Sequence, residues 1–150
     1  MPSSLTNLLF HVVFSTKRRQ PEIVPGFRED LYAYLGGIIR SEKGKLIEIG
    51  GTSDHVHILA RFSPAVSVSD MLKIIKGSSS RWVNKSGKRP SGFAWQKGYG
   101  AFSVSESGCQ AVVNYIRNQE EHHRKMRFQD EFKLLLDKHQ VEYNEEYLWD

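Results

Sequence analysis

The sequence predicts an α+β domain in which helices cover one face of an antiparallel sheet. The first observation is the order of the segments, which is strand, helix, strand, strand, helix, strand and then two added helices. The second is the length, since 150 residues are enough for one domain with a substantial core. The third is that no repeat, linker or low-complexity segment divides the chain. We therefore expect a single domain over residues 1–150.

The first half of the chain predicts a strand, a helix and a hairpin. Alternating apolar residues predict a strand over 8–15. Pro25 suits the first turn of a helix, and apolar residues then recur at helical spacing to about Arg40. A β-prone run over 45–49 is followed by turn residues over 50–53, where a further strand begins. The two strands on either side of this turn should form a hairpin.

The second half begins with another helix and a last strand. Ser67 and Asp70 match a capping box, and helical periodicity continues to Val83. A polar, basic loop is expected over 84–92. A β-prone segment from about Tyr99 onward then supplies the fourth strand of the sheet.

Helices complete the chain. Ser107 and Gln110 match a second capping box, which predicts a helix running to about His123. From about residue 125 we expect a helical tail, with its helix over 128–139. The aromatic residues that follow this helix are expected to pack on the domain.

The simplest topology that buries this pattern is the ferredoxin-like (RRM-like) split βαβ arrangement, in which the first and third strands are central. His55 and His57 lie on one face of the third strand, because residues two apart on a strand share a face. The opposite face is wholly apolar and consists of Val56, Ile58, Ala60 and Phe62. The two histidines are therefore expected mid-sheet, on the face that the two main helices leave open.

Composition limits the classes of function. The net charge of +4 and the pI of about 9.2 favour a polyanion as partner. The single Cys109 excludes an internal disulfide and a multi-cysteine metal site. The chain has no apolar run long enough to span a bilayer and no signal-peptide pattern, so we expect a cytoplasmic protein.

A second pair of residues gives the histidines a chemical partner. Tyr115 and Gln119 are four residues apart in a predicted helix, so they share one face of it. Either pair alone has an ordinary explanation, since strand histidines are often merely solvated and a helix tyrosine usually packs. Together they suggest chemistry, because an amide oxygen can be a third metal ligand and a phenol can attack phosphorus.

The motif His55-Val56-His57, preceded by Asp54, and the segment from Tyr115 to Gln119 resemble a known family. This family is the single-tyrosine transposases of small bacterial insertion sequences, within the HUH endonuclease superfamily. HUH denotes two histidines around a bulky hydrophobic residue. The resemblance includes further blocks in the family's order and covers most of the chain up to about residue 124; these blocks are 10–19, 72–81 and 95–99.

The resemblance implies a transposase that cleaves and rejoins single-stranded DNA through a covalent 5′-phosphotyrosine. Tyr115 would be the nucleophile. His55, His57 and Gln119 would hold a divalent metal ion, Mg²⁺ or Mn²⁺. The DNA would contain a hairpin, and the protein would be a homodimer whose active sites can be shared between chains. Basic residues would cradle the backbone of the hairpin, namely Lys17, Arg18, Arg19, Lys73, Lys76 and Arg81.

Alternatives stay open at this point. On ligand softness alone, two imidazoles and an amide oxygen suit zinc or another transition metal at least as well as magnesium. His122 and His123 are left out of the metal set, because histidines at a helix end commonly complement its dipole. The chain could instead be a non-cleaving, ferredoxin-like regulator that binds nucleic acid, or a domesticated repeat-associated relative of the family. It could also be a phosphodiesterase that activates water and does not need Tyr115.

Overall fold

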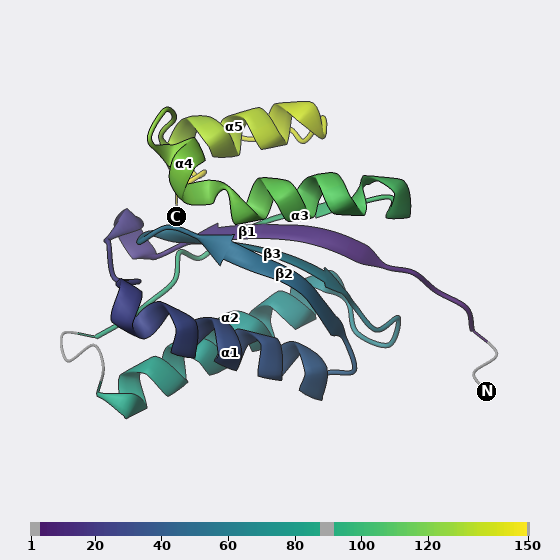
Figure 1. Cartoon of the computed structure of the whole chain (residues 1–150), viewed down its shortest axis with the longest axis horizontal. Coiled ribbons are helices and arrows are strands. Elements are labelled where there is room, and N and C mark those ends of the chain that lie inside the picture. Colours follow the sequence, from purple (N-terminus) through teal and green to yellow (C-terminus); the bar gives the residue numbers. More distant parts are fainter. Residues whose placement is uncertain (1–3, 88–91, 150) are drawn as a thin grey trace.

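The structure is a computed structural model that describes residues 4–87 and 92–149. Its strands and helices follow the predicted order (Figure 1). They are β1 (Leu9–Ser15), α1 (Pro25–Ser41), β2 (Lys45–Gly51), β3 (His55–Arg61), α2 (Val68–Ser86), β4 (Gly100–Ser103), α3 (Cys109–Arg117), α4 (Gln119–His123) and α5 (Phe128–Lys138), with one-turn 3-10 helices η1 (Lys17–Arg19) and η2 (Glu106–Gly108). Within the described ranges, no helix is both long and apolar enough to cross a membrane.

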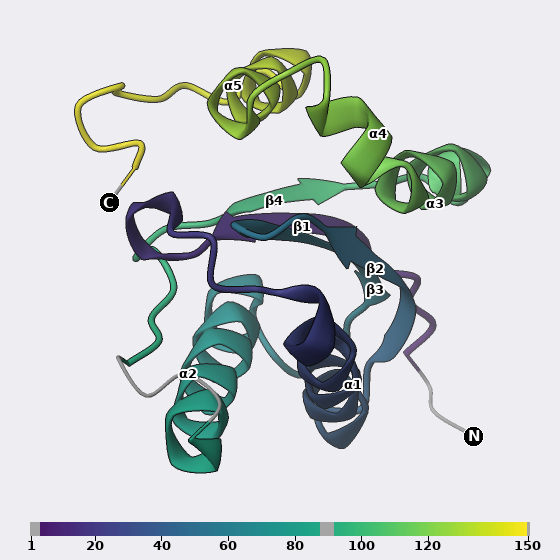
Figure 2. The same ribbon diagram turned by 60° about the vertical axis from the view of Figure 1, so that its left-hand side comes forward.

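The four strands form one antiparallel sheet in the order β2-β3-β1-β4. The predicted hairpin is formed by β2 and β3, and the predicted central strands β1 and β3 are central. Helices α1 and α2 cover one face of the sheet, while α3 and α5 lie over the other (Figures 1 and 2). The ferredoxin-like arrangement is therefore confirmed, with the added helices on the second face.

The two faces of the sheet have separate cores. On the α1 and α2 side, Val56, Ile58 and Ala60 of β3 are buried together with Val12 and Phe14 of β1. On the other side, Phe128 and Phe132 of α5 pack on Phe102, and the expected packing of the tail is confirmed because Leu148 and Trp149 join this cluster. A third cluster holds α3 against the sheet and consists of Leu9, Leu59, Val113 and Ile116.

Three local predictions need correction. The helix expected to reach His123 is broken at Asn118, whose φ of −99° and ψ of 21° separate α3 from α4. Asparagine favours such breaks because its side chain competes for backbone hydrogen bonds. Ser107 does not cap a helix, because it lies inside η2 and Gly108 precedes α3.

The third correction concerns the end of α2. This helix continues through Ser86 and ends at Gly87, whose φ of 73° is the left-handed conformation that glycine adopts without strain. Part of the loop expected over 84–92 is therefore helical, while residues 88–91 lie outside the described residues. The start of α2 is as predicted, because the Ser67 side chain accepts a hydrogen bond from the Asp70 backbone N–H.

Gly50 allows α3 to lie close to β2, and we expect Gly50→Ala to destabilise the fold. A Cβ at this position would lie 2.7 Å from the backbone oxygen of Ile116. The resulting overpacking should lower the free energy of unfolding by about 1–3 kcal/mol, measured by urea denaturation. Gly26→Ala is the matched control, since a Cβ there meets nothing within 4 Å. Equal stability of the two variants would contradict this description of the α3 contact.

Candidate active site

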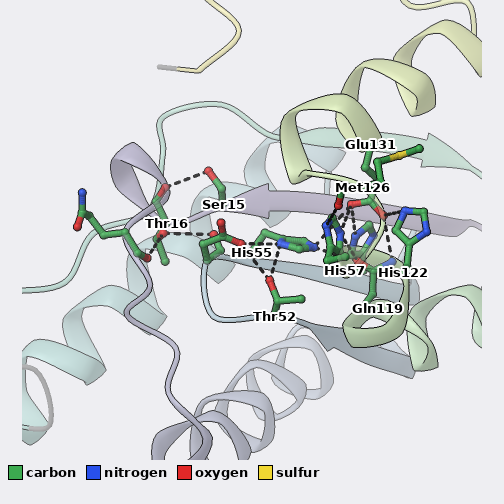
Figure 3. Close-up of polar contacts among 12 residues, drawn as sticks. Ser15, Thr16, Thr52, His55, His57, Gln119, His122, Met126 and Glu131 are labelled. Carbon is green, nitrogen blue, oxygen red and sulfur yellow. Dashed lines mark hydrogen bonds and ion pairs between the residues drawn. The ribbon is translucent and has the colours of Figure 1, made fainter.

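The two histidines of β3 are fully buried, and a polar partner holds each ring. Figure 3 shows Thr52 beside His55, and Gln119 and Glu131 near His57. Nδ1 of His55 lies 2.8 Å from Oδ1 of Asp54 and 3.0 Å from Oγ1 of Thr52. Nδ1 of His57 lies 2.8 Å from Nε2 of His11. Because Nδ1 of each ring already has a hydrogen-bond partner, Nε2 is the ring atom left for a ligand, and both Nε2 atoms are directed to the same side of the sheet.

These outer partners suit histidines that bind a metal ion. A proton on Nδ1 of His55 is donated to the Asp54 carboxylate, which leaves the lone pair on Nε2. The same tautomer of His57 donates to His11. Burial lowers the pKa of His57 to about 4 and that of His11 to about 3, so both rings are neutral at pH 7. Neutral imidazole is the form that ligates metal ions.

Gln119 brings an amide oxygen to the histidines. It is the first residue of α4, and its side chain is buried. Its Oε1 lies 2.9 Å from Nε2 of His55, while its Nε2 donates a hydrogen bond of 3.1 Å to Oε2 of Glu131. The structure thus brings together the three side chains that the sequence suggested as ligands, although the helix break places Gln119 on a different helix from Tyr115.

Tyr115 lies beside the same histidines within one chain. Its ring centroid is 5.6 Å from that of His57, and its hydroxyl donates a hydrogen bond to Glu131. Burial raises the pKa of the phenol, and the negative charge of Glu131 raises it further. The described arrangement therefore holds the phenol in its protonated form, with the oxygen at the edge of the histidine cluster.

The sequence reasoning left His123 out of the metal set and did not consider Glu131, yet both side chains lie in this cluster. His55, His57, His123 and Glu131 each place one potential ligand atom within 4.8 Å of the others. His123 follows Gln119 by four residues, which is about one helical turn. Its place beside Gln119 could therefore have been predicted once Gln119 was considered a ligand. Glu131 lies on the buried face of α5 beside Phe128 and Phe132, and a carboxylate on an apolar stripe was the signal that could have identified it.

Comparison with known proteins places the chain in a family. The profile of the family described as "Transposase IS200 like" matches residues 4–119. The chain belongs to this family of transposases. The match ends at Gln119, so His123 and Glu131 of this transposase lie outside the matched residues.

Relatives of this IS200-like transposase include the ISDra2 transposase TnpA of Deinococcus radiodurans, which is 26% identical over 117 residues. That alignment covers 75% of this chain and 84% of the relative. The transposase for insertion sequence element IS200 of Salmonella typhimurium is 25% identical over 118 residues, which cover 75% of this chain and 77% of the relative.

Two solved structures resemble this transposase in fold. The crystal structure of a Deinococcus radiodurans transposase superposes with a TM-score of 0.64 at 27% identity and covers 79% of this chain and 95% of its own. A REP-associated tyrosine transposase bound to a REP hairpin has a TM-score of 0.61 at 12% identity and covers 82% of this chain and 72% of its own. The second likeness shows that the two proteins share a fold.

Two groups of basic residues of this transposase line hollows on either side of one segment, residues 94–97. Ser15 pairs with His55, so the three basic residues of η1 leave the sheet at the histidine end of β3. Lys17 and Arg18 line a hollow over residues 94–97, and a second hollow of about 440 Å³ places Lys73 and Lys76 of α2 against the same segment. The two predicted basic clusters are therefore joined through this segment.

The individual basic residues differ in their exposure and in their contacts within the protein. Lys73 and Arg81 are exposed, although Arg81 does not line the hollow. Lys76 is half-buried and donates hydrogen bonds to the backbone oxygens of Lys97 and Gly98, at 2.8 and 2.7 Å. Burial lowers its pKa to about 8. Arg19 lies over the Trp149 ring, with its guanidinium carbon 5.2 Å from the ring centroid.

We expect His11 to make the metal-free transposase unstable in acid. Its pKa is about 3 in the folded protein and about 6.5 in the unfolded chain, so the unfolded state binds more protons between these values. Its contribution is constant above pH 6.5, and stability falls as the pH drops from 6.5 towards 3, by about 1.4 kcal/mol per pH unit at most. Urea denaturation in EDTA at several pH values measures this slope.

The comparison variant for this measurement is His11→Phe, which keeps an aromatic ring but does not titrate. Its slope between pH 6.5 and 4 should be shallower than that of the wild type, whatever the cost of the lost hydrogen bond to His57. Comparing slopes rather than absolute stabilities removes that cost. Parallel curves for the two proteins would show that His11 is not the group that titrates.

Proposed function

We propose that this transposase cleaves and rejoins single-stranded DNA with Tyr115 as its nucleophile and a divalent metal ion at His55, His57 and Gln119. The observation that carries the proposal is the position of the Tyr115 ring, 5.6 Å from that of His57. Nε2 of the other histidine, His55, faces the Gln119 oxygen at 2.9 Å. A nucleophile and a set of metal-type donors thus share one small volume.

In the first covalent step, Tyr115 attacks the DNA and Glu131 accepts the phenolic proton. The Tyr115 oxygen forms a bond to phosphorus as the bond between phosphorus and the 3′-oxygen breaks. The phenolic proton passes to Glu131, which accepts the hydrogen bond of the hydroxyl, and from Glu131 to water, while the departing 3′-oxygen takes up one proton from water. The product is a 5′-phosphotyrosine and a free 3′-hydroxyl.

The rejoining step reverses this exchange. The 3′-hydroxyl of another cleaved strand attacks the phosphotyrosine and gives its proton to water. As the Tyr115–phosphorus bond breaks, the tyrosine oxygen regains a proton through Glu131. One phosphodiester bond replaces another, so joining needs no ATP. Since each chain has one such tyrosine, exchange between two cleaved strands favours a homodimer. Tyr115 lies beside the histidines of its own chain in the described arrangement, so each chain brings a complete set of side chains.

The donor set fits the metal ion that this chemistry needs. A bound divalent ion polarises the scissile phosphate and stabilises the charge that develops on it. The histidines are held by Asp54 and His11 in the tautomer that turns Nε2 to the ion. His55 and His57 are fully buried, whereas Tyr115 and His122 are partly exposed, so the phosphate approaches from the side of the tyrosine.

A DNA hairpin is the proposed substrate. The solved relative of the same fold is described as bound to a REP hairpin. In this chain, Lys17 and Arg18 of η1 lie at the end of the sheet where His55 begins β3, and Lys73 of α2 lines the second hollow over residues 94–97. Contacts of lysine and arginine with phosphates would position a hairpin without reading its sequence.

The proposal is tested with labelled hairpin-bearing single-stranded DNA and a divalent metal ion. A protein–DNA adduct that survives denaturant is the expected product, and it should not form in EDTA. Hairpin binding without cleavage would instead support a regulator that binds nucleic acid. Cleavage without an adduct would support a phosphodiesterase that activates water.

A further inference from the structure

His123 turns a lone pair toward the candidate metal site. Its Nδ1 donates a hydrogen bond of 2.7 Å to the backbone oxygen of Met126, which fixes the tautomer of the neutral ring. Its Nε2 then carries the lone pair, and it lies 3.0 Å from Oε1 of Gln119 and 3.0 Å from Oε1 of Glu131. Because both of those oxygens are acceptors, a neutral His123 has no proton to offer them.

Glu131 brings a negative charge into the same volume. Its side chain is 1% exposed. Oε1 lies 3.2 Å from Nε2 of His57 and 3.6 Å from Nε2 of His55. Among the described residues, the contacts of this carboxylate come from histidines, Tyr115 and Gln119, and none comes from a lysine or arginine. A carboxylate removed from water in this way requires a positive charge beside it.

We propose that His123 and Glu131 are metal ligands alongside His55 and His57, and that the site takes a transition-metal ion such as Mn²⁺, Co²⁺ or Zn²⁺ in preference to Mg²⁺. The inference deepens the proposed function and rests on its metal site. It adds donors from α4 and α5, both at positions beyond the span of the family match.

The donor chemistry decides the class of metal. Three imidazole nitrogens and one carboxylate oxygen lie within 4.8 Å of one another, and the Gln119 oxygen lies among them. Ligand atoms on opposite sides of an ion with bonds of about 2.1 Å are about 4.2 Å apart, so only a small contraction is needed. Imidazole-rich sites suit zinc and other transition metals, whereas magnesium prefers oxygen ligands and retains its water.

The competing explanation is a metal-free cluster in which protonated histidines balance Glu131. Burial opposes protonation of His123, but the hydrogen bond and the charge of Glu131 still raise its pKa above the usual value. Such a cluster would need these side chains for stability and would have no need of a cation. Metal affinity therefore separates the two explanations, because only a ligand set binds an ion tightly and loses affinity when one ligand is removed.

The test measures metal binding by the protein over residues 1–150, in the absence of DNA. Cobalt(II) is titrated and followed by its visible absorption spectrum, and Zn²⁺, Mn²⁺ and Mg²⁺ are then added as competitors. The same titrations are made on Glu131→Gln and His123→Ala, with circular dichroism to verify folding. Asp130→Asn is the matched control, because Asp130 is the exposed neighbour of Glu131 on α5 and pairs with Arg127.

We expect one Co²⁺ per chain, displaced by Zn²⁺ at far lower concentration than by Mg²⁺. Glu131→Gln and His123→Ala should each weaken Co²⁺ binding by about 10- to 100-fold or more and change its spectrum, while Asp130→Asn should bind as the wild type does. Wild-type affinity in both ligand variants, or displacement by Mg²⁺ as readily as by Zn²⁺, would overturn the inference and leave the three-ligand proposal intact. Absence of binding by the wild-type protein would overturn the metal site as a whole.

Discussion

Replacing Tyr115 by phenylalanine should abolish the covalent protein–DNA adduct and lower strand cleavage by at least about a thousandfold. The variant loses the only atom that the proposed step uses as nucleophile, while the ring keeps its place beside His57 and His11. The hydrogen bond to Glu131 is lost as well, but Gln119 still donates to the same carboxylate. Hairpin binding, measured by gel shift, should therefore stay close to that of the wild type.

Tyr99→Phe is the matched control for this prediction. Tyr99 is partly exposed and borders the basic hollow beside Lys76, so it is the tyrosine most able to mimic a nucleophile near DNA. Its replacement should leave adduct formation intact. If cleavage by Tyr115→Phe persists at the wild-type rate, the transferase mechanism is wrong and water is the nucleophile.

His57→Ala should have the second largest effect and abolish cleavage without abolishing hairpin binding. His57 is held by His11 from one side and reaches Glu131 from the other, so its removal leaves a gap at the centre of the donor set. Loss of outer-shell partners alone commonly lowers metal affinity or activity 10- to 100-fold, and loss of a ligand should exceed about 100-fold. The readouts are adduct formation and hairpin affinity on the same preparation.

His139→Ala provides the control for this variant. His139 stacks on Phe102 and makes none of the cluster's contacts, so cleavage should be retained after its replacement. A large loss of hairpin binding in His57→Ala, with a normal circular dichroism spectrum, would mean that His57 contacts DNA directly. A normal cleavage rate would remove it from the metal site.

The fold was predictable because the sequence shows which face of the sheet is wholly apolar and which carries polar side chains. Period-two alternation in β3 separates Val56, Ile58 and Ala60 from His55 and His57, and the order of strands and helices predicts the topology in which β1 and β3 are central. Local turn chemistry was less informative. The serine pattern predicted a cap correctly at Ser67 and wrongly at Ser107, because the chain enters a 3-10 turn before Ser107 that no short pattern encodes.

The site was predictable only in part, for a physical reason. Spacing placed His55 with His57 and Tyr115 with Gln119, each pair on one face of its predicted element. That the two pairs meet was implied by the resemblance to the transposase family, and the structure brings them together. Glu131 reaches the site because α5 folds back over the sheet, and that return depends on the packing of Phe128 and Phe132 against Phe102. A long-range contact of this kind leaves no spacing rule in the sequence.

The most direct test of the account is to locate the tyrosine that becomes linked to DNA. Wild-type protein is incubated with labelled hairpin DNA and metal ion, denatured, digested with trypsin and nuclease, and sequenced by tandem mass spectrometry. The expected modified peptide is residues 98–117, with the nucleotide on Tyr115 rather than on Tyr99. Cleaved DNA with no modified tyrosine, or modification of any other residue, would contradict the account.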